Sequence, residues 1–171
     1  MIGRGAQLAR YAAAAEAAVD EARGIFVSHL GAAPALAKGK GDFATQADLE
    51  IEALLRERLA QSTGIDVYGE EHGGQLNPKA CWVVDPIDGT LAYMKRTPWW
   101  CVPIAVIEDG RAVAAAIHAP VVGETYVATR GGGAMRNGEA IAASDVETLE
   151  DASFLGDARL IEGPQWAEPW P

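Results

Sequence analysis

Cysteine, basic residues and long hydrophobic runs are all scarce in this chain of 171 residues. The two cysteines, Cys81 and Cys101, stand singly in apolar runs, which argues against a disulfide scaffold or a zinc site and favours reduced thiols. Only 14 lysines and arginines oppose 24 acids, and the net charge of -10 disfavours nucleic acid or an anionic membrane as the main partner. Glu16 and Asp20 interrupt the alanine-rich start, so it does not resemble a secretion signal, and no segment could span a membrane. We therefore expect a soluble, cytoplasmic protein.

The apolar residues make up 49% of the chain, which is enough for one folded domain with a core. Helical spacing predicts an alanine-rich helix over 7–30 and a second helix over 46–60, and a flexible basic segment at 38–42 separates them. Asp109-Gly110 and Asn137-Gly138 mark tight turns between strands. The strands are expected at 65–68, 80–84, 100–107, 111–118 and 125–129. This order predicts an α+β fold with two N-terminal helices packed on a largely antiparallel sheet.

An apolar run from Trp82 to Val84 ends in a Pro-containing turn with two acids, Asp85 and Asp88. An acid at the end of a buried strand is costly unless something compensates its charge. Gly89 and Thr90 follow. Gly89 permits close approach of the backbone, and Thr90 places a hydroxyl at a predicted helix start. Together they suit the binding of a phosphate-sized anion. A divalent cation that bridges acid and phosphate would satisfy both features, even in an acidic protein.

A second pair of acids, Glu70 and Glu71, follows the short strand at 65–68. If this strand lies beside the strand at 80–84, the carboxylates converge at one edge of the sheet. Oxygen ligands without histidine or cysteine suit Mg²⁺ or Mn²⁺.

Each element of this pattern also has a simpler interpretation. Asp85 could cap a helix whose first residue is Pro86. Glu70 and Glu71 could form a solvated turn, and Thr90 could be a surface hydroxyl. Asp48 could only cap its own helix, since Thr45 and Asp48 form a T-x-x-D pattern close to a capping box. The joint occurrence of these residues favours the ion site.

Three motifs carry a resemblance to a known family. In order and approximate spacing, Gly41–Asp48, Gly69-Glu70-Glu71 and Asp85–Thr90 resemble the inositol monophosphatase family, and the similarity continues to Gly132-Gly133-Ala134. The resemblance implies the N-terminal part of a layered α/β/α/β/α fold. It makes residues 1–155 a metal- and phosphate-binding domain and residues 156–171 the start of a missing C-terminal domain.

The resemblance also implies roles for individual residues. Glu70, Asp85 and the Ile87 carbonyl would hold a first Mg²⁺, and Asp85 and Asp88 would share a second ion. The backbone N–H groups of Gly89 and Thr90 would bind the substrate phosphate. Asp48, Glu70 and Thr90 would form the catalytic set, with Thr90 oriented by Asp48 to activate the attacking water. Lys38, with Lys40 as its alternative, and Glu71 are further candidates.

The function implied by the resemblance is Mg²⁺-dependent hydrolysis of a small phosphate ester, by a homodimer and without a covalent intermediate. Inositol phosphate and histidinol phosphate lead as substrates, and a 3'-phosphoadenosine nucleotide or fructose bisphosphate are alternatives. The chain lacks the W-D motif that completes the second metal site in relatives: Trp166 and Trp170 are followed by Ala167 and Pro171. We therefore expect a truncated form of a full enzyme, and the alternative is a non-catalytic relative that binds metal or a protein partner.

Overall fold

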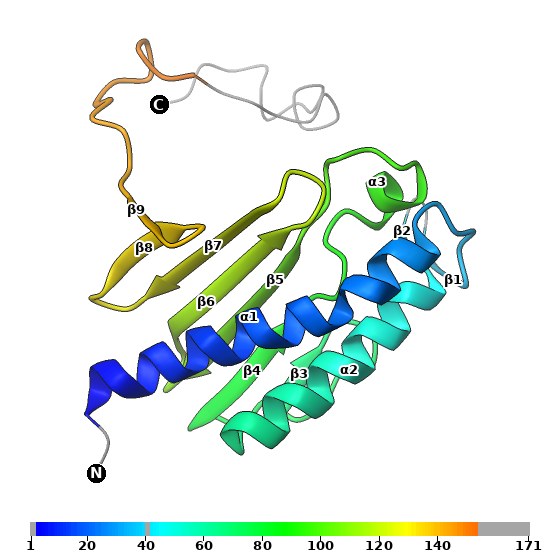
Figure 1. The fold of residues 1–171 in the computed structure, drawn as a ribbon, viewed down its shortest axis with the longest axis horizontal. Coiled ribbons are helices and arrows are strands. Elements are labelled where there is room, and N and C mark those ends of the chain that lie inside the picture. Colours follow the sequence, from blue (N-terminus) through cyan, green and yellow to red (C-terminus); the bar gives the residue numbers. More distant parts are fainter. Residues whose placement is uncertain (1–2, 40–41, 154–171) are drawn as a thin grey trace.

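Two long helices lie on one face of a seven-stranded sheet in the computed structural model, which describes residues 3–39 and 42–153 (Figure 1). The helices are α1 (Arg4–His29), α2 (Gln46–Thr63) and the short α3 (Thr90–Met94). The sheet runs in the order β3 (Val67–Gly69), β4 (Ala80–Val84), β5 (Val102–Glu108), β6 (Arg111–Ala119), β7 (Glu124–Thr129), β8 (Gly133–Arg136) and β9 (Glu139–Ile141). Only β3 and β4 pair in parallel among these strands; the other pairs are antiparallel. The predicted α+β fold is confirmed.

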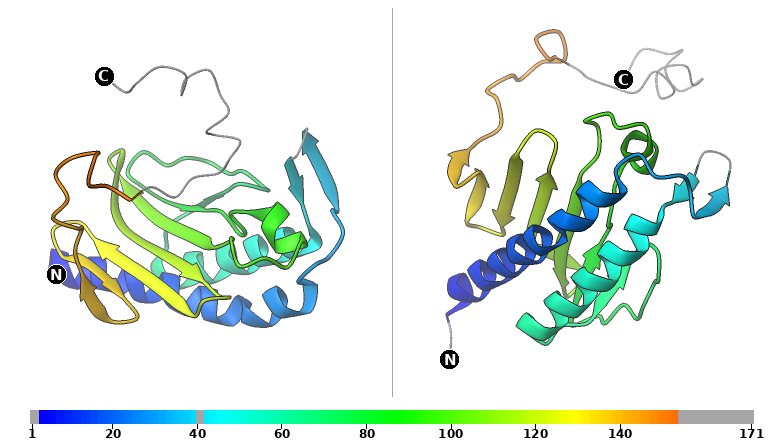
Figure 2. Two further views of the ribbon diagram at one scale, coloured as in Figure 1. Left: turned by 90° about the horizontal axis from the view of Figure 1, so that it is seen from above. Right: turned by 45° about the vertical axis from the view of Figure 1, so that its right-hand side comes forward.

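The core lies between the two long helices and the sheet, as the view from above shows (Figure 2). Along α1 the buried positions include Ala15, Ala18 and Ala22, which recur at helical spacing and are at most 1% exposed. Because these side chains are small, α1 can approach its neighbours closely while larger residues such as Trp82 and Leu55 fill the space around them. Within the described residues, no helix has both the length and the apolar character needed to cross a membrane.

Two short strands that the sequence did not predict lie on either side of residues 40 and 41, within and beside the segment expected to be flexible. β1 (Leu36–Gly39) pairs antiparallel with β2 (Asp42–Ala44), in a two-stranded sheet of its own. The backbone N–H of Ala35 extends the pairing by donating to Ala44 O at 2.8 Å. Backbone pairing of this kind does not depend on a hydrophobic pattern, so the glycine- and lysine-rich sequence gave no signal of it. Lys40, Gly41 and the predicted domain start at 156–171 lie outside the described residues.

The predicted tight turns are confirmed. Asp109 and Gly110 join β5 to β6 with φ values of 48° and 72°, and Asn137 and Gly138 join β8 to β9 with 50° and 81°. Positive φ at both central residues is what a right-twisted two-residue hairpin requires. Helix α2 continues to Thr63, three residues beyond its expected end, and stops where Gly64 adopts a left-handed conformation.

Candidate metal and phosphate site

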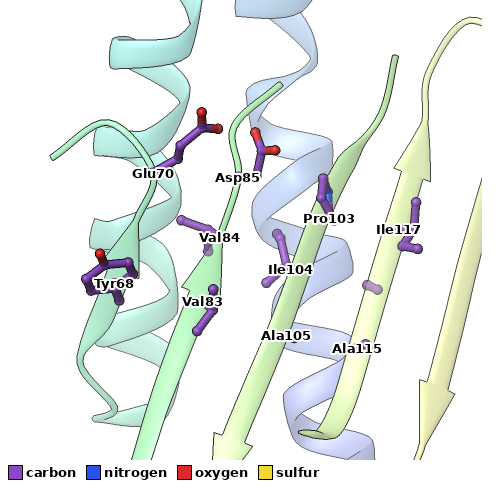
Figure 3. A pocket seen from close by; sticks show the side chains of 11 residues that line it. Tyr68, Glu70, Val83, Val84, Asp85, Pro103, Ile104, Ala105, Ala115 and Ile117 are labelled. Carbon is purple, nitrogen blue, oxygen red and sulfur yellow. The ribbon is translucent and has the colours of Figure 1, made fainter. Parts of the chain in front are cut away.

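The parallel pairing of β3 with β4 brings two acids to the same edge of the sheet. Gly69 is in register with Val84, so Glu70 and Asp85 leave the sheet side by side. The Glu70 N–H donates to Val84 O at 3.2 Å and continues the pairing by one residue. Figure 3 shows the side chains of Glu70 and Asp85 at the same end of the two strands. The expectation that these strands are neighbours is confirmed.

The two acids stand at one end of a hollow of about 510 Å³ on the sheet face away from α1 and α2. Apolar side chains of four strands form most of its wall, including Val83, Pro103, Ala105 and Ile117. Such a wall offers few hydrogen-bond partners to a polyol. The polar side chains in the wall are Tyr68, Glu70 and Asp85.

Asp85 lies in an environment that disfavours its charge. Burial, the negative charge of Glu70 and that of Asp88 together raise the pKa of Asp85 to about 8. The Ile87 N–H donates to Asp85 Oδ1 at 3.0 Å and acts in the opposite direction. Negative charge is thus concentrated at this edge of the sheet, and a bound cation would allow Asp85 to ionise at neutral pH.

The donors available around Asp85 are all oxygen atoms. Glu70 and Asp88 supply carboxylates and Ile87 a carbonyl, a set that fits Mg²⁺ or Mn²⁺ in its chemistry. In residues 3–39 and 42–153, however, no three His, Cys, Asp or Glu side chains are gathered as a metal-binding group. Asp88 is exposed, and its Oδ2 is 3.8 Å from the thiol sulfur of Cys101. The structure brings Glu70 and Asp85 together, and Asp88 lies near enough for its charge to raise the pKa of Asp85.

Lys38 supplies a positive charge to this acidic edge. Its Nζ donates to Glu71 Oε1 at 2.6 Å and to Glu70 Oε1 at 3.0 Å. Burial opposes the charge of Lys38, but the hydrogen bonds to Glu71 and Glu70 outweigh it and raise the pKa of Lys38. The Glu71 side chain is only 2% exposed, whereas that of Glu70 is 45% exposed. Glu71 is therefore placed as the buried partner of Lys38, and Glu70 as the more accessible one.

Thr90 contacts Asp48, a residue of α2. Asp48 Oδ2 accepts from the N–H of Thr45 at 2.7 Å and from its hydroxyl at 2.6 Å, so Asp48 completes the capping box of α2. The other oxygen, Oδ1, is 3.4 Å from Thr90 Oγ1. Burial raises the pKa of Asp48, while the hydrogen bonds from Thr45 and Thr90 act in the opposite direction. Asp48 thus caps its own helix and contacts Thr90 at the same time.

The hydroxyl of Thr90 has two acceptors within reach. Besides Asp48, it lies 3.1 Å from the carbonyl oxygen of Ile87. A hydroxyl has one proton, so it can donate to only one of them at a time. Thr90 is accordingly half-buried and hydrogen-bonded, and the interpretation of it as a surface hydroxyl is wrong.

The alternative interpretation of Asp85 as a helix cap is also wrong. Helix α3 begins at Thr90, and its N-cap is Gly89, which has a φ of 91°. A Cβ atom at Gly89 would lie 2.6 Å from Trp99 O and 3.2 Å from Trp100 Cα. Packing alone therefore requires glycine here, and the predicted role of the Gly89 and Thr90 N–H groups in phosphate binding stays a prediction.

Sequence reasoning missed Glu52 and Arg56, two residues of α2 that contact the acidic turn, defined here as residues 69–73. It also missed His72, a residue of the turn whose ring nitrogen contacts Glu52. A pattern in α2 could have indicated Glu52. The buried positions of this helix recur every four residues, at Ala47, Ile51, Leu55 and Leu59. Asp48 and Glu52 fall on that same buried side, and a buried acid needs partners.

The inositol monophosphatase family matches residues 6–168, and this chain belongs to that family. It is 36% identical over 151 residues to inositol-1-monophosphatase ImpA of Mycolicibacterium smegmatis, which covers 88% of this chain and 54% of that protein. It is 34% identical over 133 residues to Nus factor SuhB of Escherichia coli, over 76% of this chain and 49% of that protein. The solved structure of extragenic suppressor protein SuhB from Bartonella henselae superimposes with a TM-score of 0.76 at 28% identity, over 82% of this chain and 56% of that one. The predicted family is confirmed, and the chain spans about half the length of these relatives.

Proposed function

We propose that this chain forms the metal- and phosphate-binding part of a Mg²⁺-dependent phosphomonoesterase that hydrolyses a small phosphate ester. The observation that carries the proposal is the position of Asp85. A partly buried carboxylate whose pKa is about 8 stands beside Glu70, at the edge of the sheet from which the chain leads to Thr90, and Thr90 contacts Asp48 of α2. A cluster of carboxylates that can hold cations, together with the hydroxyl of Thr90 and the carboxylate of Asp48, is a combination suited to phosphate hydrolysis.

The residues divide into two groups in this proposal. Glu70, Asp85, the Ile87 carbonyl and Asp88 would hold the cations. Bound Mg²⁺ would neutralise charge on the phosphate and lower the pKa of a water molecule. The Thr90 hydroxyl would accept a proton from the attacking water while it donates its own to Asp48, whose raised pKa suits a proton acceptor. The N–H groups of Gly89 and Thr90 would orient the phosphate.

Inositol phosphate is the first proposed substrate, because the relative from Mycolicibacterium smegmatis is named an inositol-1-monophosphatase. Histidinol phosphate is the second, since Leu91-Ala92-Tyr93 follows Thr90 where many inositol phosphatases carry a T-N-F type sequence. A 3'-phosphoadenosine nucleotide and fructose bisphosphate complete the panel. The predicted homodimer stays a prediction.

The test is phosphate release from these four esters by the full chain, with Mg²⁺ and with EDTA. We expect Mg²⁺-dependent release that Asp85→Asn abolishes. Asp145→Asn is the matched control, because it makes the same chemical change at an exposed position far along the chain from the site. A folded chain that binds Mg²⁺ but releases no phosphate from any of the four esters would refute the enzymatic proposal.

A second candidate function is a non-catalytic role, in which the chain binds metal or a protein partner without turnover. It is supported by the name of the Escherichia coli relative, a Nus factor. This candidate predicts metal binding without phosphate release. The same assay therefore separates the two functions.

A further inference from the structure

We infer that Glu52 and Arg56 of α2 are positioning residues that hold the acidic turn so that Glu70 faces Asp85. The inference rests on the proposed function in one respect, since it concerns the geometry of the proposed cation ligands. It assigns a role to two residues that lie outside the family motifs described above.

The carboxylate of Glu52 is the acceptor around which the acidic turn is built. Its side chain is 0% exposed. Glu52 Oε2 accepts from the N–H of Glu71 at 2.6 Å, and Oε1 accepts from the N–H of His72 at 3.0 Å. His72 Nδ1 also lies 3.0 Å from Oε1. Two successive backbone N–H groups directly after Glu70 are thus fixed to one carboxylate of a different element.

Arg56 fixes the two ends of the same turn. Its guanidinium donates to the carbonyl oxygen of Val67 before the turn and, at 2.8 Å, to that of Gly73 at its end. It also donates to Glu52 Oε1 at 3.0 Å, which supplies the counter-charge for the buried carboxylate. The planar fork of an arginine can make these bonds at once, whereas the ammonium of a lysine acts as a point charge.

Gly69 shows how closely the turn encloses the carboxylate. A Cβ atom at Gly69 would lie 2.1 Å from Glu52 Oε1 and 2.4 Å from Oε2. The φ of Gly69 is not positive, so glycine is required here by the space that Glu52 occupies rather than by the backbone conformation. Burial opposes the charge of Glu52, but the donors from Glu71, Arg56 and His72 outweigh it and lower the pKa of Glu52.

A positioning role follows from which atoms are held. The N–H groups of Glu71 and His72, which directly follow Glu70, donate to Glu52. The N–H of Glu70 itself donates to Val84 O of β4. With its backbone held on both sides, Glu70 starts from a fixed position beside Asp85 (Figure 3), and its Oε1 accepts from Lys38 Nζ at 3.0 Å. Groups that orient metal ligands typically change metal affinity by about 10- to 100-fold when they are removed.

The experiment compares Glu52→Gln with Leu55→Ala in the full chain. Leu55 lies on the same helix, is 0% exposed and packs in the core, so its truncation lowers stability without removing a hydrogen bond to the acidic turn. Amide hydrogen exchange and Mg²⁺ titration calorimetry are the two measurements. Arg56→Lys is the conservative variant.

We expect Glu52→Gln to speed exchange at the Glu71 and His72 amides selectively and to weaken Mg²⁺ binding about tenfold or more. Leu55→Ala should leave Mg²⁺ affinity within about twofold of wild type at an equal or larger loss of stability, and Arg56→Lys should fall between the two. Unchanged exchange at both amides, or Mg²⁺ affinity that follows stability alone across the three variants, would overturn the inference. If the wild-type chain binds no Mg²⁺, the proposed function fails, while amide exchange still decides whether Glu52 holds the turn.

Discussion

The raised pKa of Asp85 makes the stability of the metal-free protein depend on pH. Between pH 4 and 8 the folded chain holds a proton on Asp85 that the unfolded chain has lost, so stability should fall as the pH rises through this window. The difference between the ordinary value of 3.8 and about 8 corresponds to about 6 kcal/mol at about 1.4 kcal/mol per pH unit. Part of the side chain is in contact with solvent, and screening reduces the expected effect to about 2–3 kcal/mol.

Asp85→Asn removes the titrating group and keeps an oxygen that can accept from the Ile87 N–H. In EDTA at pH 9 the variant should therefore be more stable than wild type by about 2–3 kcal/mol, or about 5–10 °C in Tm for a chain of this size. At pH 5 only a small part of the cost of ionising Asp85 in the folded chain has developed. The free energies of unfolding of the variant and wild type should therefore differ by less than about 1 kcal/mol. Thermal and urea unfolding between pH 5 and 9 measure it.

Two controls sharpen this prediction. Asp145→Asn should follow the wild-type pH profile, because Asp145 is exposed. Mg²⁺ at 100 times its Kd should bring wild type level with Asp85→Asn, since it adds about 2.7 kcal/mol to the protein that binds it, and at 1,000 times its Kd it should reverse their order, since it then adds about 4.1 kcal/mol. Parallel pH profiles for wild type and Asp85→Asn in EDTA would refute the argument that Asp85 is the strained carboxylate at this edge.

Three further predictions test single contacts of the site. Lys38→Met should destabilise the metal-free chain by about 2 kcal/mol in urea unfolding, because it leaves the Glu71 carboxylate without its counter-charge, and Lys38→Arg should restore most of the loss. Thr90→Val should lower Mg²⁺-dependent phosphate release about 100-fold while Tm changes little, and Thr90→Ser should retain activity; equal loss in both variants would remove the hydroxyl from the mechanism. Gly69→Ala should cost about 2–3 kcal/mol because its Cβ would meet the Glu52 carboxylate, whereas Gly24→Ala, in a helix with open space around it, should stabilise by about 0.5–1 kcal/mol.

The parts of the site that depend on local pattern were predictable from the sequence. An apolar strand followed directly by Asp85 indicated a carboxylate at the end of a strand, and the short run before Glu70 indicated another. Whether the two strands that carry these carboxylates pair with each other could not be predicted, because strand pairing depends on the whole chain and not on local pattern. The hairpin of β1 and β2 was missed because its residues carry no alternation of apolar and polar side chains.

Side-chain direction was the least predictable property. A bridge of backbone hydrogen bonds between Asp88 and Cys101 places Asp88 Oδ2 3.8 Å from the cysteine sulfur, while the charge of Asp88 still acts on Asp85. That bridge joins residues 13 positions apart and leaves no trace in the motif itself. A motif therefore identifies which residues carry the chemistry, while long-range pairing decides which of them face one another.

Helix α2 connects the two halves of the site through one side of its surface. Asp48 and Glu52 are four residues apart, so they lie above one another on the buried face of the helix. Asp48 contacts Thr90, and Glu52 contacts the turn that carries Glu70, so the helix sets the separation between the hydroxyl and the edge with Glu70 and Asp85. Because both acids are buried and partnered, a shift of α2 along its axis would break both sets of hydrogen bonds at once. The buried face of this helix therefore does more than fill the core. Because it packs against the sheet, it holds Asp48 and Glu52 at a fixed distance from each other within the site.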